Sequence, residues 1–203
     1  MFRLELDFLN GAQRASSDFL ELKSRFAAGV NWEGASFLKI PPEVIDEINI
    51  EGAENLVRLK QALSLPAFPA IELLTDWNEI LPEEDRLIHE VYGDAVVVKN
   101  VFPHGRIRIS PLIMKAVVTE KMGIGHKPPV SLAGLLAHEA FHISQFLNDR
   151  ERVERDLIVR QNKGIEAWFN TQTEWEAIKF ERDWVESGKG FVRSLQRLAS
   201  KIN

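Results

Sequence analysis

Hydrophobic residues recur at helical spacing through much of the first 90 residues. The spacing of Phe19, Leu20, Leu22 and Phe26 predicts an amphipathic helix over residues 16–30. A second, short helix is expected at residues 41–49, because its two leading prolines suit a first helical turn. A third is expected at residues 54–65, where the following prolines end it. Residues 1–90 should therefore form a mixed, mostly helical N-terminal region.

The pattern changes near Tyr92, where β-branched residues become frequent. Ala95–Lys99 (AVVVK) and Arg106–Ser110 (RIRIS) read as strands, and the intervening NVFPHG supplies residues typical of a turn. Alternation of arginine and isoleucine in the second segment gives it one polar face. These two segments predict an antiparallel hairpin.

From Pro111 onward the spacing is helical to the end of the chain. Gly123–Pro129 and Gly188–Gly190 are the clearest breaks in this half. The expected fold class is α+β, with a small antiparallel sheet followed by a helical half, and residues 91–203 form the second unit. The expected helices are Pro111–Met122, Ser131–Asn148, Arg150–Asn162, Glu166–Ser187 and Phe191–Ile202.

Composition narrows the classes of protein and of site. The chain has no cysteine, which excludes disulfides and thiolate metal ligands and fits a reducing compartment such as the cytoplasm. A net charge of −5 gives no general attraction to nucleic acid or anionic membranes. The acidic N-terminus does not resemble a secretory signal, and no run approaches the roughly 18 apolar residues of a membrane span. We therefore expect a cytoplasmic protein that binds neither nucleic acid nor membranes.

Two histidines and a glutamate interrupt the apolar run LLAHEAFHISQF. His138 and His142 are four positions apart, so a helix places both rings on one face. Two imidazoles at this spacing can bind one zinc ion, and Glu139, a third of a turn away, can reach a water bound to that ion. The HExxH pattern therefore predicts zinc-activated water with Glu139 as the general base. The alternative is two separate core histidines, which would require two sets of buried hydrogen-bond partners.

A third zinc ligand has to come from elsewhere in the chain. The remaining histidines, His89, His104 and His126, all precede the motif, and the HExxHxxGxxH extension is absent because Gln145 and Asn148 occupy its positions. A carboxylate from the following helical region is the better candidate. The acids of the segment TEWEAIKFERDW are Glu174, Glu176, Glu181 and Asp183.

The segments HEAFH and EWEAIKF together resemble the gluzincin zinc metallopeptidases. Their prenyl-protein-protease branch and the repressor-cleaving peptidases of mobile elements have a similar E-aromatic-x-A segment. The resemblance covers residues 131–184 and extends loosely back to the hairpin. It implies a zincin-like metallopeptidase core over residues 91–203, a Zn²⁺ cofactor held by His138, His142 and Glu174, and a peptide or protein substrate.

The site and its surroundings leave alternatives open. Glu176 is the rival ligand, and Glu174 could instead belong to a capping box that begins at Thr171. The family usually has Asp or Asn four residues after the ligand glutamate to orient a zinc histidine; this chain has Ile178. Gln145, three residues after the second histidine, is similar to the glutamine of HExxHxxQ variants.

Such peptidases bind substrate as an added strand at a sheet edge, for which Arg106–Ser110 is the first choice and Ala95–Lys99 the second. Candidate donors to the charge developing on the substrate carbonyl are His104, His126 and Tyr92, although each reads more simply as a loop or surface residue. Core packing is the simplest explanation of three tryptophans at roughly helical spacing. They are Trp168, Trp175 and Trp184.

The leading hypothesis is a zinc-dependent peptidase. A catalytically inactive or latent zinc-binding protein of the same fold is the alternative, favoured by the isoleucine at position 178. A metal-free helical interaction module is the third. The N-terminal region could serve as a lid, an inhibitory segment or a surface for a partner protein.

Overall fold

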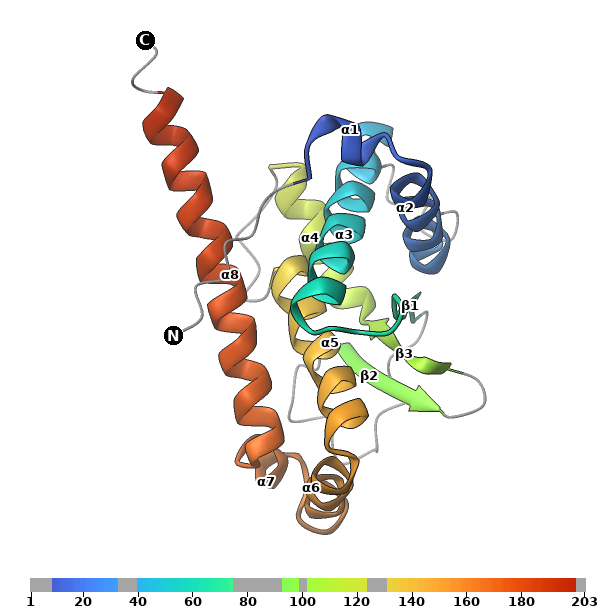
Figure 1. Cartoon of the computed structure of the whole chain (residues 1–203), viewed down its shortest axis with the longest axis vertical. Helices are drawn as coiled ribbons and strands as arrows, with labels where there is room; N and C mark the ends of the chain where they lie inside the picture. Colours follow the sequence, from blue (N-terminus) through green and yellow to red (C-terminus); the bar gives the residue numbers. More distant parts are fainter. Residues whose placement is uncertain (1–8, 33–39, 75–92, 99–101, 124–130, 200–203) are drawn as a thin grey trace.

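A computed structural model describes residues 9–32, 40–74, 93–98, 102–123 and 131–199 (Figure 1). Helices dominate and a small sheet lies to one side of them. The predicted α+β class is therefore confirmed. The elements in chain order are α1 (Gly11–Arg14), α2 (Ser17–Val30), α3 (Pro42–Ala62), β1 (Ala70–Leu73), β2 (Gly93–Val98), β3 (Phe102–Ile109), α4 (Pro111–Lys121), α5 (Leu132–Asn148), α6 (Arg150–Lys163), α7 (Ile165–Phe169) and α8 (Gln172–Ala199).

The helix α3 is a single helix where the hydrophobic pattern predicted two. It runs through the expected gap at residues 50–53 and has Pro42 in its first turn. Gly52 lies at the contact with α2, where a Cβ atom would stand 2.3 Å from Cζ of Phe26. This glycine therefore allows the two helices to approach closely and does not end the helix.

The sheet is mixed, which makes the expectation of a purely antiparallel sheet wrong. Its strand order is β1-β3-β2. β1 pairs with β3 in parallel, with Ala70 opposite Arg106, and β2 pairs with β3 antiparallel, with Gly93 opposite Ile109. The parallel partner was not predicted because β1 has only four residues and lies far from β3 in the chain.

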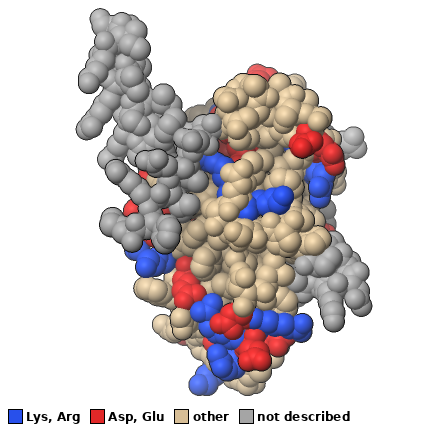
Figure 2. Space-filling view, in the orientation of Figure 1, with Lys and Arg blue, Asp and Glu red and all other residues tan. Residues whose placement is uncertain are grey.

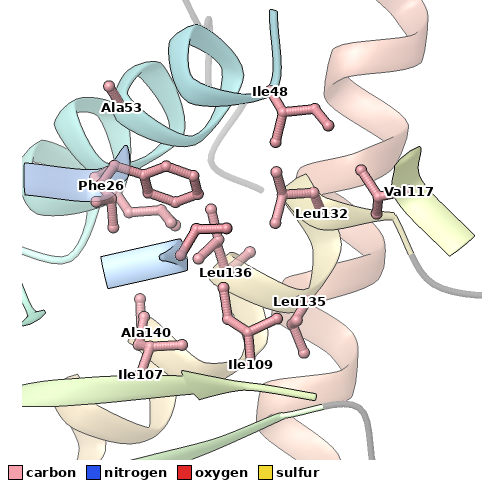
Figure 3. Packing of buried hydrophobic residues seen from close by; sticks show 14 of the residues in the cluster. Phe26, Ile48, Ala53, Ile107, Ile109, Val117, Leu132, Leu135, Leu136 and Ala140 are labelled. Atoms are coloured by element: carbon pink, nitrogen blue, oxygen red, sulfur yellow. The ribbon is translucent and has the colours of Figure 1, made fainter. Parts of the chain in front are cut away.

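One hydrophobic core joins the N-terminal helices to the sheet and to α5 (Figure 3). Ile107 and Ile109 of β3 are fully buried beneath Leu136 and Ala140 of α5. Phe26 of α2 packs into the same cluster. The predicted division near residue 90 falls in the stretch 75–92, outside the described residues. On both sides of that stretch, the described residues contribute to this core.

Gly105 fixes the approach of α5 to the sheet. Its φ is +86°, which favours glycine, and a Cβ atom there would stand 2.6 Å from Cδ1 of Ile143. Ile143 follows His142 in α5 and is fully buried. Close contact at Gly105 therefore holds the histidine-bearing turn of α5 against β3.

The C-terminal helices differ from the prediction in their breaks. The expected helix Glu166–Ser187 is divided at Asn170–Thr171, and the expected break at Gly188–Gly190 is absent because α8 continues through it. α8 lies alongside α5 (Figure 1). Ala177 at their contact is fully buried, as expected for a small residue between closely packed helices.

The lower end of the molecule in Figure 2 shows charged side chains of both signs, where α6 lies. An exposed ion pair joins Arg150 and Glu154 at 2.6 Å. The outer side of α6 is therefore a charged face in contact with solvent. None of the helices within the described ranges combines the length and apolar character that a membrane-crossing segment requires.

Candidate metal centre

α5 brings the two histidines of the motif together. The N-cap of α5, Ser131, accepts a hydrogen bond from the Gly134 amide and sets the start of the helix. One turn apart, Nε2 of His138 and Nε2 of His142 lie 3.1 Å from each other. Their rings stand nearly perpendicular, at 78°. Both imidazoles therefore present the same nitrogen to one point.

Glu174 reaches that point from α8. Its Oε2 lies 3.1 Å from Nε2 of His142, and its Oε1 lies 3.5 Å from Nε2 of His138. One donor atom from each of the three residues lies within 4.8 Å of the others. The three residues predicted as zinc ligands are thus neighbours in space, although Glu174 is 32 positions from His142.

Glu176, the rival candidate, points elsewhere. Its carboxylate accepts hydrogen bonds from Gln145 at 3.2 Å and from Gln172 at 2.8 Å, and it forms an ion pair with Arg152 at 3.1 Å. The capping alternative for Glu174 holds only in part. Thr171 Oγ1 accepts from the Glu174 amide at 3.3 Å, while the Glu174 carboxylate is directed to the histidines.

A second carboxylate contacts the outer nitrogen of His138. Oε2 of Glu181 lies 3.1 Å from Nδ1 of that ring. An ionised carboxylate only accepts hydrogen bonds, so Nδ1 carries the proton in this contact. The sequence offers Glu181 as a possible ligand but does not indicate its contact with His138, because the family pattern directs attention to position 178. Ile178 is 45% exposed.

Gln145 contacts Nδ1 of His142, as Glu181 contacts Nδ1 of His138. Its Nε2 donates to the carbonyl oxygen of Thr173 at 2.9 Å and to Glu176 at 3.2 Å. Both partners are acceptors only, which fixes the orientation of the amide and directs Oε1 to Nδ1 of His142, 2.9 Å away. Nδ1 of His142 is therefore the donor in this bond. In a neutral His142 ring, the lone pair of Nε2 faces the centre.

The cluster favours a positive charge at its centre. Burial alone would lower the pKa of His138, but hydrogen bonds to Glu174 and Glu181 and the nearby Glu139 charge raise it to about 10. Burial alone would raise the pKa of Glu174, but hydrogen bonds from the two histidines lower it to about 2. A proton on His138 supplies this charge at neutral pH, and a bound metal cation would replace that proton.

This donor set fits zinc. Two imidazoles and one carboxylate form one of the ligand sets of catalytic zinc, which leaves a further position for water or substrate. The outer nitrogens of both rings are already engaged, as metal-ligating histidines require. Glu139 lies on the same helix, is 5% exposed, and acts on His138 through its charge. It is outside the three-donor group.

Several other predicted features differ from the structure. β3 is the central strand, so the choice of Arg106–Ser110 as a free edge is wrong; β2 lies at an edge. Trp168 and Trp184 are buried, but Trp175 is 59% exposed, so core packing does not explain it. Trp168 lies beside the centre, with its ring centroid 5.8 Å from that of His142.

Of the three predicted carbonyl donors, the structure describes His104 alone. His104 is exposed on β3. Tyr92 and His126 lie outside the described residues, as does His89.

Comparison of the chain with protein-family models, with curated proteins and with solved structures finds no match.

Proposed function

We propose that this protein is a zinc-dependent metallopeptidase that hydrolyses peptide bonds. The observation that carries the proposal is the convergence of His138, His142 and Glu174, with Nε2 of each ring directed inward and Nδ1 of each ring engaged. The resemblance to the gluzincins also implies a zincin-like fold. The arrangement of α5, its neighbour α8 and the adjacent sheet is compatible with that fold.

The protein's own side chains have distinct roles in this proposal. His138, His142 and Glu174 would hold the zinc ion. When bound, zinc supplies a Lewis acid that polarises the substrate carbonyl and lowers the pKa of a water. Glu139 would accept a proton from the attacking water while the oxygen of that water bonds to the carbonyl carbon. It would then deliver that proton to the leaving nitrogen as the C–N bond breaks.

The sheet offers a place for the substrate backbone. Within the described part of the chain, β2 has one strand neighbour, β3, and it contacts α5. A peptide added as a strand along this edge would run beside the histidine-bearing helix. For this reason we propose β2, instead of β3, as the strand beside which the substrate binds. The substrate would be a peptide or an unfolded protein segment in the cytoplasm.

The decisive experiment compares zinc content and hydrolysis in matched variants. Purified protein should contain one zinc per chain by elemental analysis and should cleave a library of quenched fluorescent peptides. Glu139→Gln should keep zinc and lose roughly 10²–10⁴-fold in rate, as expected for a general base. Glu151→Gln, an exposed acid on α6, is the control and should change neither quantity. Zinc-loaded protein that cleaves nothing in the library would overturn the peptidase proposal.

The alternative of a latent zinc-binding protein depends on Ile178, which stands where the family usually has an orienting Asp or Asn. The contact of Glu181 with His138 supplies an orienting carboxylate by another route, which weakens that alternative. Zinc retained at one ion per chain, with the same background cleavage in wild type and Glu139→Gln, would favour this alternative.

A further inference from the structure

We propose that Glu181 and Gly134 act together to position His138 for metal binding, with Glu181 as the orienting acid and Gly134 providing its space. This inference rests on the proposed zinc site and adds two residues to it. Neither residue belongs to the HExxH pattern or to the three-donor group.

The carboxylate of Glu181 contacts the outer ring nitrogen of His138. Oε2 of Glu181 lies 3.1 Å from Nδ1 of His138, with side-chain exposures of 25% and 14%. A carboxylate at Nδ1 keeps the proton on that nitrogen, fixes the ring angle and makes Nε2 a better ligand. Glu181 therefore acts on the metal through His138 and does not touch it.

Glu181 projects from the more buried face of α8. Glu174, Ala177, Glu181 and Trp184 follow a helical repeat of three or four positions, and all are less exposed than Trp175 or Ile178. Ile178, at 45% exposure, lies toward the solvent. The acid is thus found at position 181, on the α5-facing side of α8.

Gly134 has no side chain and so leaves space on α5 beside the Glu181 carboxylate. A Cβ atom at this position would stand 3.1 Å from Oε1 of Glu181, 3.1 Å from Cγ2 of Val185 and 3.2 Å from Oγ of Ser131. Gly134 is one helical turn before His138 on α5, so both face the same carboxylate. Any larger residue would press against Glu181. Gly134 is the third residue of α5, and its lack of a Cβ atom leaves this room beside Glu181.

The test measures metal affinity in the folded protein. Zinc dissociation constants are obtained by competition with a chromophoric chelator, and visible spectra of the Co²⁺ form report the ligand geometry. Glu181→Gln keeps the shape and loses the charge, and we expect roughly tenfold weaker zinc binding. Glu181→Ala loses both, and we expect a loss nearer to 100-fold. Asp183→Asn removes an exposed acid from the same helix and should leave affinity unchanged.

Gly134→Ala tests the proposed pairing independently. It should weaken zinc binding by several-fold to roughly tenfold and shift the Co²⁺ bands, because the added methyl displaces the Glu181 carboxylate. In a Glu181→Gln, Gly134→Ala double variant, the losses should not add, since both changes disturb one contact. Thermal unfolding of the metal-free forms shows whether each variant is folded.

The outcomes separate this inference from the proposed function. Wild type that binds no zinc would overturn the metal site itself. Wild type that binds zinc, with folded Glu181 variants of equal affinity and identical Co²⁺ spectra, would overturn only the role of Glu181. Fully additive losses in the double variant would overturn the pairing with Gly134.

Discussion

The side-chain amide of Gln145 joins His142 to the backbone of the helix that carries Glu174. Its Oε1 is 2.9 Å from Nδ1 of His142, and its Nε2 is 2.9 Å from the carbonyl oxygen of Thr173. Gln145 is 5% exposed, so water does not readily replace either partner. One residue thus orients a proposed ligand on α5 and ties it to the first turn of α8.

Two substitutions of Gln145 should separate these functions. Gln145→Glu keeps an acceptor for His142 but loses the donor to Thr173 and places a second acid beside Glu176. We expect zinc affinity within a few-fold of wild type and a loss of about 1–3 kcal/mol in the free energy of unfolding. Gln145→Leu loses both partners and should also weaken zinc roughly 10–100-fold. Chemical denaturation and chelator competition measure the two quantities.

The exposed Gln161 on α6 provides the matched control, because Gln161→Glu makes the same chemical change away from the centre. It should alter neither stability nor zinc affinity. Equal losses of zinc affinity in Gln145→Glu and Gln145→Leu would show that the contact with His142 is not what matters.

Removal of the metal should lower the melting temperature of the whole chain. A ligand present at about 100 times its dissociation constant stabilises the native state by about 2.7 kcal/mol. For a chain of 203 residues, that corresponds to a fall of roughly 5–10 °C on chelation. Differential scanning calorimetry with and without a chelator measures the shift, and added zinc should reverse it. His142→Ala should melt at the same temperature in both conditions; an equal response to zinc would place the metal elsewhere.

The pairing of His138 with His142 could be predicted from the sequence because its geometry is local. Ser131 caps α5, and four positions along any α-helix bring two side chains onto one face. The choice between Glu174 and Glu176 could be stated but not made from local pattern, because both lie in the first turns of one helix. The rotation of α8 about its axis decides between them, and tertiary packing against α5 fixes that rotation.

Several of the unpredicted features depend on contacts between distant segments. Glu181 contacts His138 across 43 positions, and β1 pairs in parallel with β3. The continuous helix α3 has the same cause. Gly52 lowers the helix propensity of its segment, and the packing of Phe26 against it restores the preference for a helix.

The contact between Gly52 and Phe26 leads to a prediction about the core. An alanine at position 52 would place Cβ 2.3 Å from Cζ of Phe26, a residue only 1% exposed. Overpacking of this kind costs about 1–3 kcal/mol, which exceeds the gain of about 1 kcal/mol in helix propensity. Gly52→Ala should therefore lower stability in urea denaturation.

A second substitution identifies the cause of that loss. Phe26→Leu shortens the opposing ring, so the Gly52→Ala, Phe26→Leu pair should lose less stability than the two single losses combined. Gly11→Ala, with nothing within 4 Å of the added Cβ, should be close to neutral. Additive losses in the pair would argue against a clash between these residues.

The ion cluster between α3 and α4 should make stability depend on alkaline pH. Nζ of Lys121 lies 3.0 Å from Glu47 and 2.9 Å from Glu51. Burial alone would lower the pKa of Lys121, but hydrogen bonding and attraction to Glu51 and Glu47 outweigh it, so the pKa is raised above 10.5. A raised pKa means that the stabilisation is fully present below 10.5 and is lost as pH rises through the folded-state value.

Lys121→Met should therefore cost up to about 1 kcal/mol at neutral pH. It should also flatten the fall in stability above pH 10.5, measured by urea denaturation across this range. Lys115→Met, an exposed lysine on the same helix, should keep the wild-type pH profile. An unchanged alkaline slope in Lys121→Met would mean that another group titrates there.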